Sequence, residues 1–195
     1  MYALEVKLDG VTLAVAGAPN AIVMSLHINT GIEQEQAWLD ISGVNDLGGE
    51  RRSHTYWIMQ QPLPPQARLE LRLVETPTAT PPIQEVAFDD PEYLASQADY
   101  QRRLREDPPV ARMLQTVSPQ ASLALTLGGQ RTVATLESGR EFLTCGLLWD
   151  AWRPEQCRVG MRSFSQAEAL ARQGARVWVH AQMGPGESCV VEIGG

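Results

Sequence analysis

The stretch YALEVKLDGVTLAVAG, residues 2–17, decides the fold class of this chain of 195 residues. Apolar residues alternate with polar or small ones on both sides of Asp9-Gly10, and a period of two is typical of half-buried β-strands. Asp-Gly is also a preferred pair in the type I′ turn of a two-residue hairpin. The pattern therefore predicts a β-hairpin, with the pairs Leu8 and Val11, Val6 and Leu13, and Leu4 and Val15.

Similar alternation recurs along most of the chain. It predicts further strands within residues 21–29, 37–44, 54–60, 67–75, 122–136, 141–149, 176–183 and 188–193. In residues 21–29, for example, Met24, Leu26 and Ile28 share one face, and His27 lies on the other. Strands that are half apolar and half polar belong to antiparallel sheets with one solvated face.

Helices are indicated by their ends. Asp90-Pro91 supplies an N-cap followed by proline at the first helical position, which predicts a helix from residue 91 to about residue 106. Ser165 and Glu168 form a capping box for a short helix, and Gly174 is expected to stop it. A further short helix is expected over residues 110–117.

Residues 76–86, TPTATPPIQEV, form a proline-rich stretch that is typical of a boundary or a stiff connector. We therefore expect an α+β fold, predominantly antiparallel β, with two sandwich-like or open-barrel-like units that are able to pack as one body. These are residues 1–80, a β-rich unit; residues 81–118, a connector with one or two helices; and residues 119–195, a β-rich unit with one short helix.

Composition and charge exclude several classes of function. The net charge is −7 and no segment is strongly basic, so a surface that follows nucleic-acid phosphates is not expected. No apolar run approaches ~20 residues, which argues against membrane insertion. The first residues lack the pattern of a secretory signal, and three irregularly spaced cysteines suit a reducing compartment. With arginine in place of almost every lysine, these features predict a protein of a bacterial cytoplasm.

Residues 143–161, LTCGLLWDAWRPEQCRVGM, raise the question of thiol chemistry. Alternation places Cys145 among leucines on the buried face of a strand, and unpaired cysteine is commonly buried and inert. Cys157, with arginines nearby, is the better candidate for a reactive thiolate. The core interpretation is favoured, and the alternative is a catalytic pair of Cys157 and His180.

Metal and cofactor chemistry find little support. Cys145, Cys157, His180 and Cys189 supply ligand types that zinc prefers, but their spacing contains no close pair of the kind that builds a zinc knuckle. The sequence also contains no G-x-S-x-G, H-E-x-x-H or Walker motif. We expect neither a metal nor a cofactor.

Two polar stretches are candidates for partner binding. Residues 45–54, NDLGGERRSH, are expected to form a loop that is either a mobile connector or a recognition loop on a rigid β scaffold. Residues 150–155 form a turn that carries Trp152, which we expect to be buried against the sheet, since an exposed tryptophan would need a functional reason. The candidate partner-binding residues are Glu50, Arg51, Arg52, His54, Asp150, Trp152 and Arg153.

The leading hypothesis is a non-enzymatic bacterial protein-binding module of the immunity, inhibitor or adaptor kind, with another protein as its partner. It depends on the two candidate surfaces and on the lack of a catalytic motif. The alternatives are a small thiol-dependent hydrolase that uses Cys157 and His180, and a structural subunit of a phage or secretion assembly.

Overall fold

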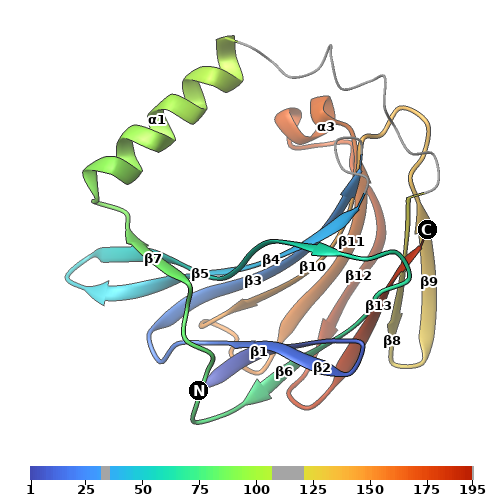
Figure 1. Ribbon diagram of the computed structural model, residues 1–195, viewed down its shortest axis with the longest axis horizontal. Coiled ribbons are helices and arrows are strands. Elements are labelled where there is room, and N and C mark those ends of the chain that lie inside the picture. Colours follow the sequence, from blue (N-terminus) through green and yellow to red (C-terminus); the bar gives the residue numbers. More distant parts are fainter. Residues whose placement is uncertain (32–35, 107–120, 195) are drawn as a thin grey trace.

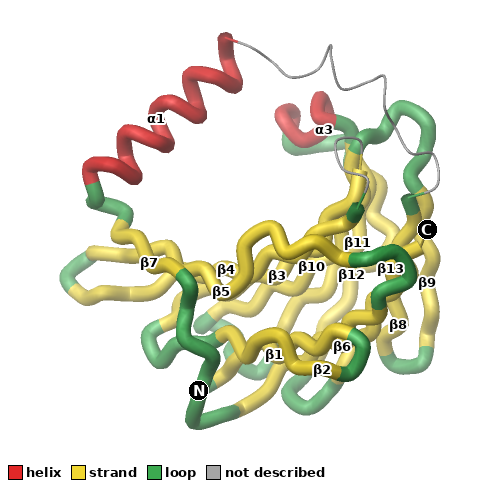
Figure 2. Tube along the Cα trace, viewed as in Figure 1, coloured by secondary structure: helices red, strands yellow, loops and turns green. Residues whose placement is uncertain are grey.

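The structure, a computed structural model, describes residues 1–31, 36–106 and 121–194. Its strands form two antiparallel sheets packed face to face (Figure 1). Sheet A has the order β2 (Val11–Ala16), β1 (Tyr2–Leu8), β6 (Arg68–Glu75), β13 (Ser188–Gly194), β8 (Ser122–Leu127), β9 (Gln130–Thr135). Sheet B has the order β12 (Arg176–Met183), β11 (Cys157–Phe164), β10 (Phe142–Asp150), β3 (Ala21–Gly31), β4 (Ala37–Gly48), β5 (Arg51–Leu63), β7 (Gln84–Ala87). The prediction of a mainly antiparallel β fold is confirmed, as strands dominate Figure 2.

Strands from both halves of the chain lie side by side in each sheet. In sheet A, β6 pairs with β13, and in sheet B, β3 pairs with β10. The inner faces of the two sheets share one hydrophobic core cluster. The predicted layout of two β-rich units is therefore not confirmed.

The proline-rich stretch packs against the strands that flank it. The N–H of Thr80 donates to the carbonyl oxygen of Val15 at 2.9 Å, and the N–H of Val15 donates to Thr80 Oγ1 at 2.9 Å. Trp57, buried on β5, donates its Nε1–H to the carbonyl oxygen of Thr80 at 3.1 Å. These bonds join the stretch to one strand of each sheet, so its expected role as a connector between two units is not confirmed either.

The first hairpin forms around the expected turn, but its predicted register is wrong beyond the first pair. Asp9 and Gly10 both have positive φ, as a type I′ turn requires, and Leu8 pairs with Val11. A β-bulge between Val6 and Lys7 then shifts the pairing by one residue, so the further pairs include Val6 with Ala14 and Leu4 with Ala16. A shift of one residue exchanges the faces of a strand. The small side chains of the return strand therefore face the core, and Val11 is exposed.

Helix α1 (Pro91–Glu106) stands over the outer face of sheet B, the face turned away from sheet A (Figure 1). Asp90 Oδ1 accepts the N–H groups of Glu92 at 2.9 Å and Tyr93 at 3.0 Å, which confirms the predicted N-cap. The rings of Phe88 and Tyr93 stack 5.7 Å apart, and Phe88 meets the edge of His54 on β5. Aromatic contacts thus hold the start of α1 against the sheet. The helix expected over residues 110–117 lies outside the described residues.

Helix α3 (Gln166–Ala171) confirms the predicted capping box, because Ser165 Oγ accepts the N–H of Glu168 and Glu168 Oε2 accepts the N–H of Ser165. The expected stop at Gly174 is wrong. The helix instead ends at Arg172, which has a φ of 55° and donates its N–H to the carbonyl oxygens of Ala169 and Glu168. Hydrogen bonds from its backbone N–H to the last turn of the helix thus hold a residue other than glycine in the left-handed region of φ and ψ.

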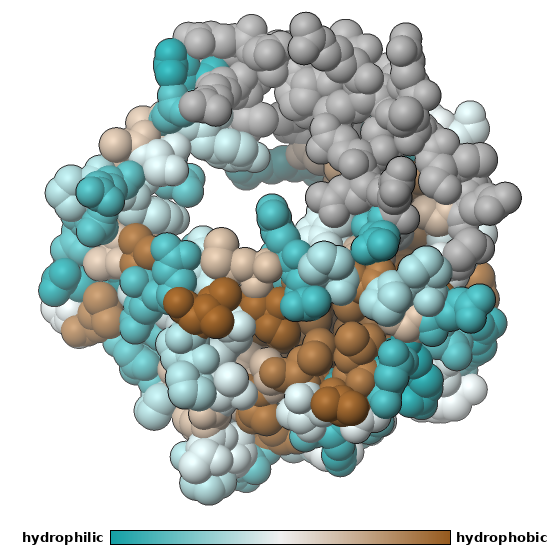
Figure 3. Space-filling view, viewed as in Figure 1, coloured by the Kyte–Doolittle hydropathy of each residue, from teal (hydrophilic) through white to brown (hydrophobic). Residues whose placement is uncertain are grey.

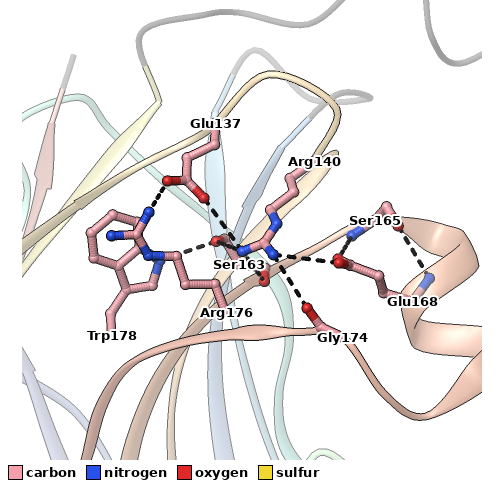
Figure 4. A network of polar contacts seen from close by, with 8 residues as sticks. All are labelled: Glu137, Arg140, Ser163, Ser165, Glu168, Gly174, Arg176 and Trp178. Carbon is pink, nitrogen blue, oxygen red and sulfur yellow. Dashed lines mark hydrogen bonds and ion pairs between the residues drawn. The ribbon is translucent and has the colours of Figure 1, made fainter.

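Arg140 joins α3 to the ends of several strands (Figure 4). Its guanidinium donates to Ser163 Oγ at 3.1 Å, to the carbonyl oxygen of Gly174 at 3.2 Å and to Glu168 Oε1 at 3.4 Å. Ser163 also accepts the indole N–H of Trp178 at 3.0 Å. The planar guanidinium holds these partners at once, and it fixes α3 at the rim of sheet B opposite α1 (Figure 1).

Candidate functional site

The turn between β10 and β11 is held from inside the fold. Trp149, the last apolar residue of β10, is buried, and its Nε1–H donates to the carbonyl oxygen of Pro154 at 2.9 Å. Asp150 accepts the N–H of Arg153 at 3.2 Å and the Nη2–H of Arg158 at 3.0 Å. The turn therefore has a defined conformation although it extends beyond the strands.

Trp152 lies in this turn with 73% of its surface exposed, so the expectation that it is buried is wrong. The physical reason is that Trp149 already fills the adjoining core position, and the hydrogen bonds of Asp150 and Pro154 direct the rest of the turn outward. Tryptophan side chains are highly buried on average, so this degree of exposure is unusual for the residue type.

Two open hollows adjoin the same turn. One, of about 480 Å³, is lined by Arg153, Pro154, Glu155 and Gln156. The second, of about 270 Å³, is lined by Asp150, Arg153, Gln156, Arg158 and Gln182. Arg153 lines both, so a partner that covered Trp152 would find concave, charged surface beside it.

Residues 45–54 do not form the expected loop. Strand β4 continues to Gly48 and β5 begins at Arg51, so only Gly49 and Glu50 lie outside the strands. Both of them and Gly48, the last residue of β4, have positive φ, which closes a tight hairpin. Glycine and polar residues were compatible with a loop, but pairing with the neighbouring strands extended both strands into this stretch.

The other candidate residues of this hairpin have partners within the chain. Arg51 Nε donates to Asp89 Oδ2 at 2.8 Å in an exposed ion pair, and Arg52 accepts the N–H of Phe88 at its carbonyl oxygen. His54 Nδ1 lies 2.9 Å from the hydroxyl of Tyr56, and burial lowers the pKa of His54. His54 therefore belongs to the aromatic contacts that hold α1.

The cross-strand register brings both candidate surfaces to one end of sheet B. Asp150 pairs with Val23, Val23 with Val44, and Val44 with His54. Three strand spacings of ~4.8 Å place the Asp150 and His54 backbones about 14 Å apart. The turn at residues 150–156 and the hairpin of β4 and β5 thus lie at the same end of sheet B, and the turn between β2 and β3 lies between them.

The structure does not bring Cys157 and His180 together. Cys157 is buried in the core, whereas His180 is exposed and pairs with Gly160 on the outer face of sheet B. Because Cys157 and Gly160 are three residues apart on one regular strand, their side-chain positions lie on opposite faces. Burial raises the pKa of Cys157 to about 12, and it raises that of Cys145 to about 12 as well.

The outer face of sheet B carries an aligned row of residues, of which sequence analysis had assigned only His180 to a candidate site. Across five strands, the register aligns Asp40, His27, Gly146, Gly160 and His180. Alternation within each strand indicates which residues face outward, but the alignment of five strands distant in sequence is set by their pairing.

Among the described residues, no group of three or more His, Cys, Asp or Glu side chains is arranged to hold a metal ion. No helix in the described part of the chain is long and apolar enough to cross a membrane. No model of a known protein family matches this chain, and no curated protein sequence matches it either.

Proposed function

We propose that this chain is a non-enzymatic protein-binding module of the immunity, inhibitor or adaptor kind, and that Trp152 anchors the partner. The observation that carries the proposal is the 73% exposure of Trp152 on a turn fixed by hydrogen bonds. Tryptophan and arginine are enriched among the residues that dominate binding energy at protein interfaces. Arg153 follows Trp152 directly and lines the two adjoining hollows.

Preorganisation supports this role for the turn. Binding costs free energy when loops and side chains must become ordered, and a turn held by Trp149 and Asp150 has already lost much of that freedom. Burial of the exposed indole against a partner then contributes to affinity, with little loss of conformational entropy to offset it. Glu50, Arg51 and Arg52, at the same end of sheet B, would lie at the edge of such an interface and favour a partner of complementary charge.

The thiol-hydrolase alternative has no support from the geometry. Cys157 and His180 lie on opposite faces of sheet B, and a thiol with a pKa of about 12 is a poor source of thiolate at neutral pH. For the assembly-subunit alternative, no specific feature of the described residues favours self-association over binding another protein.

The experiment is capture of a partner by the tagged chain from the lysate of its native host, followed by titration with the purified partner. Trp152→Ala is expected to weaken binding by about tenfold or more. The control is Val133→Ala, which trims another exposed apolar side chain on β9 of sheet A. Reversing the charges at residues 50–52 is expected to slow association with a smaller effect on the dissociation rate.

Three results would count against the proposal. The first is the lack of any stoichiometric partner, and the second is a partner that binds the Trp152→Ala variant as it binds the wild type. The third is an equal loss of affinity in the Trp152→Ala and Val133→Ala variants. Recovery of a second copy of the chain alone would favour the assembly-subunit alternative.

A further inference from the structure

A second surface, independent of the Trp152 end, lies at the centre of the outer face of sheet B. Gly146 on β10 and Gly160 on β11 are directly paired, and we call them the glycine floor. His27 on β3 pairs with Gly146 from one side, and His180 on β12 pairs with Gly160 from the other. Two histidines thus face each other across two positions that lack side chains, with backbones about 14 Å apart.

The two glycines differ in what lies above them. A Cβ atom at Gly146 would come within 2.9 Å of the carbonyl oxygen of Leu26 and 3.2 Å of Nδ1 of His27. The imidazole of His27 therefore leans over Gly146, and glycine is needed there. A Cβ atom at Gly160 would meet only the carbonyl oxygen of Val179, at 3.9 Å. The space above Gly160 is open within the described part of the chain.

His27 lies beside Asp40 on this face, because the two residues are paired across β3 and β4. Its side chain is exposed to solvent, yet the nearby protein atoms lower its pKa by desolvation, against the opposing influence of Asp40. Helices α1 and α3 stand at the rims of the same face (Figure 1), and Figure 3 shows an opening beside α1.

Positive charge borders the open position. Arg158 and Arg162 lie two residues before and after Gly160 on β11, so they share its face. Arg158 is paired with Asp150, with Nη2 and Oδ2 3.0 Å apart. The side chain of Arg162 is exposed and has no ion-pair or hydrogen-bond partner among the described residues. An unpaired guanidinium and an exposed imidazole therefore border a position without a side chain.

We propose that the glycine floor is a binding site for a small ligand carrying an oxyanion, either a phosphate or a carboxylate. The oxyanion lies over Gly160, where Arg162 and His180 donate hydrogen bonds to it. Arginine suits this role because its planar guanidinium matches the geometry of both groups. The rest of the ligand extends over Gly146 toward His27 and Asp40, whose carboxylate is suited to accept hydrogen bonds from hydroxyl groups.

The test is a titration of the full chain with inorganic phosphate, and separately with acetate, at constant ionic strength kept with sodium chloride. The readout is the NMR signal of each imidazole Cε1–H. We expect saturable shifts of the His180 and His27 signals and none of the signal of His54, which lies among the aromatic contacts of α1. Saturable shifts with phosphate alone, with acetate alone or with both will show which oxyanion the site accepts.

Two variants connect the shifts to the glycine floor. Arg162→Gln is expected to weaken binding by about tenfold. Gly160→Val is expected to remove binding while keeping the strand, because the space above Gly160 admits a side chain and valine favours strands. Arg131→Gln, on sheet A, is the matched control and should bind as the wild type does.

The proposal is overturned if neither anion gives a saturable shift in the millimolar range, or if Arg162→Gln and Gly160→Val bind like the wild type. If Gly160→Val fails to fold, Gly160→Ala and Arg162→Gln decide the question. Because Trp152 plays no part in this site, the outcome is independent of partner binding at the end of sheet B.

Discussion

The indole Nε1–H of Trp149 donates a hydrogen bond of 2.9 Å to the carbonyl oxygen of Pro154. Trp149 is part of the core, and Pro154 is exposed in the turn that carries Trp152. A core side chain and the exposed turn that carries Trp152 are therefore joined by one contact. The same stretch contributes to the core and supports a surface for binding.

This contact predicts a much larger loss of stability on substitution at Trp149 than at Trp152. Trp149→Phe removes the donor and part of the buried side chain, and we expect it to lower the free energy of unfolding by about 1–3 kcal/mol. Trp152→Ala should change that free energy by less than about 0.5 kcal/mol, because the side chain contributes little to the core. Urea unfolding of both variants measures the difference. An equal loss in the two variants would show that Trp152 packs in the folded state.

The three cysteines are expected to be unreactive until the chain unfolds. Cys145, Cys157 and Cys189 are all free and buried, and burial raises their pKa, to about 12 for Cys145 and Cys157. At pH 8, only about one Cys157 side chain in ten thousand is then a thiolate. Ellman's reagent should therefore label the native chain slowly and three thiols per chain in guanidinium. Rapid labelling of one native thiol would contradict the buried arrangement.

Arg140 is expected to matter more for stability than an exposed arginine does. Its side chain is 19% exposed and donates to partners on β11, α3 and the segment before β12. Arg140→Gln removes these hydrogen bonds and ion pairs together and leaves the carbonyl oxygen of Gly174 without its donor, which should cost about 2–3 kcal/mol. Arg131→Gln, which breaks the exposed ion pair with Glu192, should cost less than about 1 kcal/mol.

Denaturant unfolding followed by hydrogen exchange in α3 tests this prediction. Arg140→Lys should restore little of the loss, because an ammonium group does not reproduce the planar set of donors. Full rescue by lysine would show that charge alone, and not geometry, holds the network.

Stability should decrease on mild acidification because of His27 and His54. Desolvation lowers the pKa of both side chains below the usual value of 6.5, so below that pH the unfolded chain binds more protons than the folded chain. Their contribution is fully present above about pH 6.5 and is lost as the pH falls toward the folded-state pKa values. The free energy of unfolding, measured between about pH 5 and pH 8, should decrease less steeply with acid in the double variant His27→Asn, His54→Asn. Identical slopes would refute this role.

Local patterns predicted most of the elements, and the failures have physical reasons. Strand β10 has the predicted buried face because alternation is a property of one strand alone. The capping box of α3 and the N-cap of α1 were equally local and are confirmed. The hairpin register failed because a bulge, which no residue type in β1 or β2 specifies, displaced the return strand by one position.

The candidate site was predicted in part. The stretch around Trp152 was identified by its residue types, but its exposure was not, since exposure depends on which tryptophan fills the core. The positions of Cys157 and His180 on opposite faces followed only from the pairing of β11 with β12. His27 was placed on a polar face, but its alignment with Gly146, Gly160 and His180 was not foreseen.

The sequence by itself determined the period of each strand, the turn at Asp9-Gly10, the N-caps of both described helices and the apolar character of the core positions. These features depend on residues a few positions apart, so local sterics and hydrogen bonding specify them. Only the tertiary structure decided the order of strands in the two sheets, the mixing of both halves of the chain, the exposure of Trp152 and the glycine floor. These features arise from packing between distant segments, where many pairings satisfy the same alternating pattern and the shared core selects one.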